Sequence, residues 1–493
     1  MAPRGVVAAG HPLSAEAGAR ILREGGNAVD AAVAAALASF SLESALTGLG
    51  AGGFMIVGGP GIETAVIDFF VAAPGHGGHE LTEQLVPVPV HFDESTTQVF
   101  NAGAASCGVP GTAAGLALAL ERFGSVPMSE LADPAAKLAR EGAPLNRQQA
   151  YVLRILEPIY TATPEAREIY APEGRILAEG DVFRYPDLGD ALERYGAEGA
   201  AALCSGEVAR RVEEYVVGRG GTLSVADFEA YRPIVRTPVG ASFRGREVLT
   251  NPPPSAGGIL ISYSLALLDR MDEDGPEEVT RAMAAANEAR DDDFASSLGQ
   301  EGFAGRFLGD RLGSTTHLAA IDSDGLCASV TCSNGTGSGM VVPGTGIHLN
   351  NMLGEEDLNP RGFHQTAPGE RISSMMSPTL IIEGDQVRAG LGSAGSNRIR
   401  SAVLQTTLNL LAGVDPQVAV DAPRIHLEAG VLQAEPGVDE DALGRIERAG
   451  QEVFRWNQRN LFFGGVQVVT RDPETGRLDG AGDPRRGGSV AHG

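Results

Sequence analysis

Ser314-Thr315-Thr316-His317 marks the point where the chain changes from mainly helical to strand-forming sequence. Residues 315–321 alternate in the manner of a half-buried β-strand. Asp322-Ser323-Asp324-Gly325 is a turn sequence, and residues 326–333 return as a second strand. The pattern predicts a β-hairpin that begins at a threonine.

The same kind of pattern continues towards the C-terminus. Residues 379–382 and 387–391 predict another hairpin, and residues 398–411 predict a helix. A final strand pair is expected to run through residues 466–470. Strands followed by helices on each side indicate two sheets sandwiched between layers of helices.

Upstream of the first hairpin, helices alternate with glycine-rich turns. Residues 14–24 predict a helix that is capped by Ser14 and ended by Gly25-Gly26. Asn27 is expected to cap a second, alanine-rich helix that reaches about Phe40. The small side chains of this second helix favour close packing against a neighbouring helix or sheet.

Gly48-Leu49-Gly50-Ala51-Gly52-Gly53 has the glycine content of a nucleotide-binding loop but not its context. A dinucleotide loop follows a strand and opens a helix, whereas this run follows helical sequence and opens the strand at residues 54–57. We therefore interpret it as a structural or oxyanion-side turn. Residues 128–290 are expected to be mostly helical, with breaks at proline and glycine.

Composition excludes several classes of protein. The chain has 493 residues, of which 43% are hydrophobic and 20% are charged, so it can bury a large core. Its net charge of -25 disfavours binding to nucleic acid or anionic lipid. No apolar run approaches the about 18 residues of a membrane span, and the start lacks a secretory signal. We expect a cytoplasmic protein, or a periplasmic or secreted one if a leader has been removed.

The cysteines and histidines give no sign of a metal site. Cys107, Cys204, Cys327 and Cys332 form no zinc-like spacing, and we expect isolated reduced thiols. Cys327 and Cys332 lie five apart in a predicted strand, so their side chains should face opposite ways. The nine histidines show no HExxH motif. We expect no metal and no organic cofactor.

Several motifs, in one order along nearly the whole chain, carry a resemblance to a known family. The chain resembles the γ-glutamyltransferase (γ-glutamyltranspeptidase) family, which includes glutathione hydrolases and belongs to the N-terminal-nucleophile hydrolases. The motifs are His11-Pro12-Leu13-Ser14, Gly25-Gly26-Asn27-Ala28-Val29-Asp30-Ala31-Ala32, Gly52-Gly53-Phe54, Pro252-Pro253-Pro254-Ser255, Thr315-Thr316-His317, Leu349-Asn350-Asn351, Ser373-Ser374-Met375, Gly392-Ser393-Ala394-Gly395 and Asp483-Pro484-Arg485.

The resemblance implies an α+β fold, a four-layer αββα sandwich of the N-terminal-nucleophile hydrolase type, built from both halves of a self-cleaved precursor. Residues 1–314 would form the large-subunit region, and residues 315–493 the small-subunit region that begins with the nucleophile. The implied activity is that of a self-processing amide hydrolase or acyltransferase. Its partners would be a small-molecule amide substrate and the two fragments of the same precursor.

Cleavage in this family precedes the first threonine of the Thr-Thr-His motif, which maps the cut between Ser314 and Thr315. The chemistry is sound on its own terms. A threonine hydroxyl is a poor nucleophile until a base removes its proton. A free α-amine titrates at about 7.7–8.0, so a useful fraction is an unprotonated base near neutral pH. The cut therefore creates base and nucleophile on one residue, Thr315.

Other family positions carry over residue by residue. Ser333, on the partner strand, matches the hydroxyl that hydrogen-bonds the nucleophile, and Asn334 matches a substrate-binding asparagine. Ser373 and Ser374 match the serine pair that holds the substrate carboxylate. Glu355 is the best match to the aspartate that binds the substrate α-amino group. Each of these roles is implied by the resemblance.

Two further positions concern the oxyanion and the acyl group. Gly395 and Ser396 match a Gly-Gly pair whose backbone N–H groups form the oxyanion hole, and serine is tolerable there because only backbone donors are needed. Phe70 replaces the arginine that clamps the α-carboxylate of the γ-glutamyl group. Phenylalanine cannot donate a charge-assisted bond. The short spacing from Glu355 to Ser373 also predicts a trimmed lid loop.

Three functional readings stay open at this point. The first is a self-processing γ-glutamyltransferase-like enzyme with Thr315 as nucleophile. In the second, γ-glutamyl specificity is lost and another amide is cleaved, as in a cephalosporin-acylase-like or small-amide hydrolase. The third is an unprocessed, inactive homologue with a binding role, which the intact processing motif disfavours.

Overall fold

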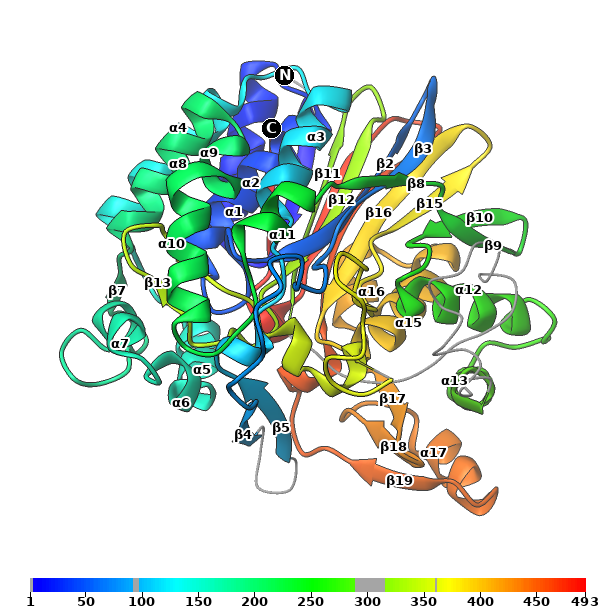
Figure 1. The fold of residues 1–493 in the computed structure, drawn as a ribbon. Helices are drawn as coiled ribbons and strands as arrows, with labels where there is room; N and C mark the ends of the chain where they lie inside the picture. Colours follow the sequence, from blue (N-terminus) through cyan, green and yellow to red (C-terminus); the bar gives the residue numbers. More distant parts are fainter. Residues whose placement is uncertain (1–2, 92–96, 289–314, 360) are drawn as a thin grey trace.

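Two β-sheets lie face to face between two layers of helices (Figure 1). The computed structural model describes residues 3–91, 97–288, 315–359 and 361–493. The observed layers confirm the predicted α+β, four-layer αββα sandwich.

The first sheet has seven strands and carries the predicted hairpin at its centre. In spatial order its strands are β22 (Ser489–His492), β1 (Gly5–Ala9), β11 (Thr316–Asp322), β12 (Cys327–Ser333), β2 (Gly52–Gly59), β3 (Ile62–Phe69) and β8 (Ile234–Arg236). β11 and β12 pair antiparallel across the turn, as the sequence predicts. Every residue of both strands is buried, because helices cover one face of the sheet and the second sheet covers the other.

The second sheet has six strands. In spatial order they are β21 (Leu478–Gly482), β20 (Gly465–Arg471), β16 (Gln386–Ala394), β15 (Thr379–Glu383), β10 (Arg246–Thr250) and β9 (Val239–Phe243). β15 and β16 form the second predicted hairpin, and β20 and β21 the final strand pair. Apolar side chains of both sheets interlock between them, for example Phe54 and Ala319 with Leu380 and Val469.

Polar side chains cap the first two helices on the outer face of the first sheet, α1 (Pro12–Glu24) and α2 (Ala28–Leu42). Asn27 and Asp30 form a capping box at the start of α2, as Asn27 was expected to do. The preceding helix begins two residues earlier than predicted, because the His11 side chain caps it and Pro12 occupies its first position. Ser14 lies inside that helix. These helices are α1 (Pro12–Glu24), α2 (Ala28–Leu42), α3 (Thr112–Phe123), α4 (Met128–Glu141), α8 (Pro186–Glu198) and α10 (Gly206–Val217).

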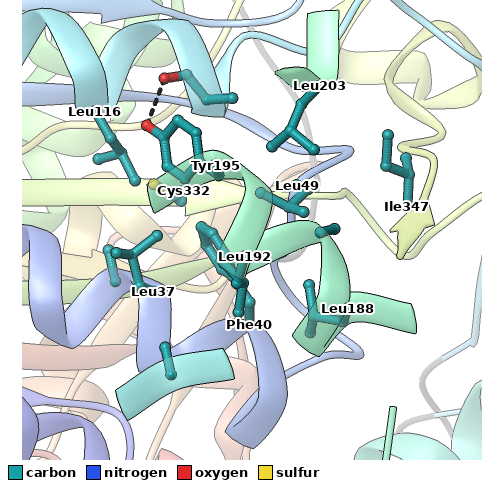
Figure 2. Close-up of a cluster of buried hydrophobic side chains, with 14 of the residues drawn as sticks. Leu37, Phe40, Leu49, Leu116, Leu188, Leu192, Tyr195, Leu203, Cys332 and Ile347 are labelled. Carbon is teal, nitrogen blue, oxygen red and sulfur yellow. Dashed lines mark hydrogen bonds between the residues drawn. The ribbon is translucent and has the colours of Figure 1, made fainter. Parts of the chain in front are cut away.

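This helical layer packs against the sheet through one large apolar cluster. Figure 2 shows part of it, where Leu37 and Phe40 of α2 meet Leu188 and Leu192 of α8. Tyr195 satisfies its buried hydroxyl by donating to the carbonyl of Ala113 at 2.6 Å. The predicted helical middle of the chain supplies α4, α8 and α10 of this layer.

The opposite layer covers the second sheet. It contains α12 (Ala256–Leu268), α13 (Pro276–Glu288), α15 (Arg398–Leu411) and α16 (Pro416–Asp421). α15 occupies the residues predicted for it and follows β16 through a tight loop at Gly395 and Ser396. The N-terminus of this helix therefore lies next to the end of a central strand.

Smaller elements lie around the sandwich. The helices are α5 (Arg147–Ile155), α6 (Glu157–Tyr160), α7 (Pro164–Tyr170), α9 (Ala201–Cys204), α11 (Val225–Ala230) and α17 (Glu440–Arg448). The strands are β4 (Val86–His91), β5 (Thr97–Ala102), β6 (Ala143–Pro144), β7 (Val182–Phe183), β13 (Val341–Val342), β14 (Ile347–His348), β17 (Ile425–Glu428), β18 (Val431–Ala434) and β19 (Glu452–Arg455). Short 3-10 turns include η3 (Met352–Gly354), η4 (Glu356–Leu358), η5 (Leu461–Phe463) and η6 (Pro484–Arg486).

The four cysteines are free thiols, as expected. Cys327 packs in the cluster between the sheets and Cys332 in the cluster beneath the helices, which confirms that they face opposite ways. Within the described ranges, we find no helix that combines the length and the apolar character needed to span a membrane.

Candidate active site

Thr315 lies immediately before β11 and is buried, with 3% of its surface exposed. Thr316 pairs with Cys332 in the β11–β12 ladder. Continuing that register by one residue places Thr315 beside Ser333, the last residue of β12. The two hydroxyl-bearing residues therefore meet at the end of the central hairpin. Ser314 lies outside the described residues.

A small cavity, with about 240 Å³ of empty space, opens at this end of the hairpin. It brings together five of the predicted site residues: Thr315, Ser333, Glu355, Ser374 and Ser396. Its other lining residues are Phe70, Met352, Asp357, Leu358, Met375, Met376 and Ile399. Residues far apart in the sequence thus converge on Thr315, and the wall is apolar except for hydroxyls and two carboxyls.

Three predicted residues are not part of this lining. Asn334 is fully buried next to Ser333, and neither polar atom of its side chain has a hydrogen-bond partner. The Ser373 hydroxyl donates to the carbonyl of Leu358 at 2.8 Å and so is already engaged. Gly395 contributes backbone, with a φ of 120° that only glycine adopts readily.

The two carboxyls of the lining are Glu355 and Asp357. Both are almost completely buried, and Glu355 Oε2 and Asp357 Oδ2 have no hydrogen-bond partner. Burial raises the pKa of each carboxyl well above its usual range, and the charge of Glu355 raises that of Asp357 further. The positive charge of Arg398 is close enough to lower both pKa values in part. The pair is suited to receive a hydrogen-bond donor that carries positive charge.

Asp357 was not identified from the sequence. It follows Glu355 by two residues, and the 3-10 turns η3 and η4 on either side of Glu355 bring both carboxyls to one cavity. A run of three acidic residues, Glu355-Glu356-Asp357, was the available signal. Glu356, by contrast, is exposed.

Phe70 forms an apolar wall of the cavity. It is fully buried and stacks on Phe54 with ring centroids 5.3 Å apart. Its backbone is held from both sides, since its N–H donates to Asp68 and its carbonyl accepts from the Tyr231 hydroxyl. Among the described residues, the lining contains no arginine or lysine. A substrate carboxylate would therefore meet hydroxyls and an aromatic ring, not a cation.

The loop between β16 and α15 contributes Ser396 to the lining of the cavity. Ser396 has a φ of 69°, in the left-handed region where side chains are strained. The backbone N–H groups of the loop precede the first turn of α15, where the helix dipole favours negative charge. This is the geometry expected of an oxyanion-binding loop.

His317 connects the nucleophile strand to the strand of that loop. Its ring is buried between the sheets, and Nδ1 lies 2.8 Å from the Thr331 hydroxyl. Burial lowers its pKa to about 3, so the imidazole is neutral. A methyl group at Gly392 of β16 would collide with this ring. In the sequence this histidine is visible only as part of the Thr-Thr-His motif, and its contact with Gly392 arises from the fold.

Glu43 is a second acid that the sequence did not reveal. It ends α2, is buried, and accepts a hydrogen bond from the Thr316 hydroxyl. Burial raises its pKa to about 7, against the lowering effects of Thr316 and the Arg486 charge. No sequence signal links residues 43 and 316, because only the fold brings them together.

Within the part of the chain that the structure describes, no group of three or more histidine, cysteine, aspartate or glutamate side chains could hold an ion.

Two facing sheets between helical layers, with a threonine at the start of a central strand beside an oxyanion-type loop, define the N-terminal-nucleophile hydrolase class. A family model described as gamma-glutamyltranspeptidase matches residues 14–301 and 285–493. The chain belongs to the γ-glutamyltranspeptidase family. It is therefore an enzyme of the amide hydrolase and acyltransferase type.

Curated relatives and a solved structure agree with this assignment. The chain is 29% identical to the glutathione hydrolase proenzyme of Bacillus subtilis (strain 168), over 99% of its own length and 91% of that protein. It is also 29% identical to the acylase ACY 1 proenzyme of Pseudomonas sp. (strain SE83), over 97% and 91%. The crystal structure of a cephalosporin acylase from Bacillus halodurans matches with a TM-score of 0.83 and 26% identity, over 99% and 96%.

Proposed function

We propose that the chain cuts itself between Ser314 and Thr315 and that Thr315 is the nucleophile of an amide hydrolase or acyltransferase. The observation that carries the proposal is the meeting of Thr315, Ser333 and the Ser396 loop at one cavity. The relatives are named proenzymes, which supports self-processing. Residues 1–314 and 315–493 would then be the two parts of the mature enzyme.

The reaction follows from the groups at this cavity. The free α-amine of Thr315 takes the proton of its own hydroxyl, and the oxygen attacks the amide carbonyl carbon. The backbone N–H groups of Gly395 and Ser396 donate hydrogen bonds to the carbonyl oxygen and stabilise the negative charge that develops on it. The amine then passes the proton to the leaving nitrogen as the C–N bond breaks. Water or an acceptor amine attacks the resulting ester and releases the acyl group.

Self-cleavage is tested on a denaturing gel. Wild-type protein should give pieces of about 32 and 19 kDa, their shares of the 51.0 kDa chain, because the hydroxyl can attack its own preceding carbonyl. The smaller piece should begin Thr-Thr-His-Leu. Thr315→Ala should remain one band. Cleavage of that variant at the same bond would rule out Thr315 as the nucleophile.

For the acyl group, we infer a preference for a cationic group without a neighbouring carboxylate. Glu355 and Asp357 offer two unpartnered carboxyl oxygens to a cation. Phe70 occupies the position at which the family resemblance implies an arginine, and the Ser373 hydroxyl already donates its hydrogen bond to the Leu358 carbonyl. Glu355 and Asp357 thus favour the amino group of a γ-glutamyl substrate, while Phe70 and Ser373 offer few hydrogen bonds to its carboxylate.

Four anilides that differ in one group at a time test this preference on the matured enzyme. They are γ-glutamyl, 4-aminobutyryl (no carboxylate), glutaryl (no amine) and butyryl (neither). We expect 4-aminobutyryl to have the highest kcat/KM and glutaryl the lowest. Glu355→Gln should remove most of the advantage of 4-aminobutyryl over butyryl, because loss of one partner of a buried charge pair costs about 2–5 kcal/mol.

The other outcomes assign the enzyme elsewhere in its family. A preference for γ-glutamyl of a hundredfold or more would mean that γ-glutamyl specificity is retained and that another group holds the carboxylate. Fastest turnover of glutaryl would exclude a cation site at Glu355. In every case the reaction type and Thr315 are unaffected.

A further inference from the structure

Ser396 combines two features that are costly in a folded protein. Its φ of 69° is strained for a residue with a side chain. Of the non-glycine residues with positive φ in the described ranges, Arg244, His364 and Ala429 are exposed, and Ser396 alone is buried. The strain therefore lies at the cavity and not in a surface turn.

The second feature is the hydroxyl. Ser396 is 4% exposed, and its Oγ is a buried atom without a hydrogen-bond partner. Seven other buried hydroxyls of the described residues also lack a partner, but none of those residues lines this cavity, whereas Ser396 does. Alanine at this position would avoid the unpaired hydroxyl and glycine would avoid the strain as well, which points to a use for the side chain.

The position of the hydroxyl suggests that use. Ser396 lines the cavity with Thr315, and its backbone N–H belongs to the loop at the N-terminus of α15. In any serine, Oγ lies about 3 Å from its own backbone nitrogen when the two are gauche, so both can donate to one acceptor. An oxyanion bound by the Ser396 N–H is thus within reach of the Ser396 hydroxyl.

We propose that the Ser396 hydroxyl is a third, side-chain donor to the oxyanion formed during attack by Thr315. The inference rests on the proposed function and adds a catalytic residue to it, since backbone donors alone would not require a serine. The hydroxyl donates its proton as a hydrogen bond to the carbonyl oxygen as negative charge develops there. It keeps that proton throughout, so no bond to Ser396 is made or broken.

Two substitutions separate the hydroxyl from the backbone. Ser396→Ala removes Oγ but keeps Cβ and its strain, whereas Ser396→Gly removes both. Each variant is assayed as the matured two-piece enzyme with 4-aminobutyryl and butyryl anilides, and the active fraction is titrated. If Ser396→Ala fails to mature, Ser396→Gly still provides the test.

We expect kcat to fall about ten- to hundredfold in both variants and with both substrates, less than the loss of a backbone donor, because two N–H groups remain. KM should change by less than about twofold, since the bond strengthens only in the transition state. Ser396→Gly should also have a higher unfolding midpoint than wild type. A merely structural serine would instead move stability and kcat in the same direction.

Two results would overturn the inference. One is a kcat within about twofold of wild type in both variants, which would leave the backbone donors sufficient. The other is an effect confined to one acyl group and expressed in KM, which would make Ser396 a contact to that group. Failure of the proposed function looks different, because wild-type protein would then lack a piece that begins at Thr315.

Discussion

Phe70 is fully buried, stacks on Phe54, and faces the same cavity as Thr315. The family resemblance implies an arginine at this position. Arginine would bind a substrate carboxylate in the cavity, whereas phenylalanine offers it no hydrogen-bond donor. Glu355 and Asp357 add two acids nearby, which strengthens the discrimination. At the scale of single residues, the proposed preference between acyl groups rests on these three side chains.

The first prediction is that Phe70→Arg raises kcat/KM for γ-glutamyl anilide relative to 4-aminobutyryl anilide by about ten- to a hundredfold. The reason is that a buried charge-assisted pair contributes about 2–5 kcal/mol, part of which is lost to packing strain. Phe70→Met, which keeps an apolar side chain, is the matched control and should leave the ratio unchanged. An unchanged ratio in Phe70→Arg would show that residue 70 does not face the carboxylate.

The second prediction concerns Glu43, whose pKa is raised to about 7. A raised carboxyl pKa stabilises the folded state below the unfolded value near 4.5, and this contribution is lost as the pH rises through 7. Glu43→Gln should therefore unfold like wild type at pH 5 but be more stable at pH 8.5, by about 1–3 kcal/mol.

Chemical denaturation at both pH values, in the uncleaved Thr315→Ala background, measures this difference. Glu24→Gln removes an exposed carboxylate that pairs with Arg20 and should behave the same at both values. Equal stability of Glu43→Gln and its parent at pH 8.5 would contradict a buried, uncompensated charge at residue 43.

At the scale of elements, the contact between β11 and β16 holds Thr315, the proposed nucleophile, near the loop at Gly395 and Ser396. His317 of β11 fills the space above Gly392 of β16, three residues before Gly395. The two strands belong to different sheets, so this packing sets the distance between the sheets near the cavity. A displacement of β11 relative to β16 would also displace Thr315 and Ser396 at the ends of these strands, because the strands are rigid.

The third prediction is that Gly392→Ala destabilises the fold by about 1–3 kcal/mol and lowers kcat, because the added methyl collides with the His317 ring. Gly444→Ala is the control, since Gly444 lies in α17 and an added methyl group would meet only the movable end of the Arg448 side chain, at 3.3 Å. That change should stabilise by up to about 1 kcal/mol. Urea denaturation and steady-state kinetics measure both. Wild-type stability in Gly392→Ala would refute the packing role.

Local sequence signals predicted the elements well. The capping box at Asn27, the turn before β12 and the start of α15 at Arg398 all depend on neighbouring residues. The predicted start of α1, at Ser14, was wrong because His11, an uncommon cap, precedes Pro12. Local patterning thus set the order of layers, and family motifs added the identity of the sandwich.

The candidate site divides in the same way. Thr315, Ser333 and Ser396 could be named because each belongs to a short motif, and the structure brings all three to one cavity. Asp357 and Glu43 could not, since their importance arises from burial and from contacts between distant segments. Desolvation is a property of the folded molecule, so no spacing in the sequence reveals it.

At the scale of the whole molecule, a buried cluster of charges anchors the C-terminal region. Asp483 accepts a hydrogen bond from Arg424 at 2.7 Å and pairs with Arg485 at 3.2 Å, and Glu435 binds Arg485 from the other side. Burial opposes ionisation of Asp483, but the two arginines outweigh it and hold its pKa below the ordinary value. The cluster joins α16, β18, β20 and η6.

The fourth prediction is that Asp483→Asn lowers the free energy of unfolding by about 3–5 kcal/mol, because it leaves two buried arginines without their shared partner. Asp479→Asn on the adjacent strand removes an exposed pair with Arg477 and should cost about 0–1 kcal/mol. Since the pKa of Asp483 is lowered, its contribution holds at neutral pH and is lost as the pH falls through that lowered value. Equal denaturation midpoints for the two variants would contradict the cluster's role.

Both sheets combine strands from the two sides of residue 315. In the first sheet β1 lies between β22 and β11, and β2, β3 and β8 continue the sheet beyond β12. In the second sheet β10 and β9 extend it beyond β15. A cut before Thr315 therefore changes the molecularity of unfolding, from one chain losing its structure to two chains parting. By mass action, dilution should lower the melting temperature of the matured enzyme but not that of uncleaved Thr315→Ala. After unfolding, the two separate pieces would have to associate again before they could refold. The rate of that bimolecular step falls on dilution, so recovery of the cleaved protein would fall with its concentration.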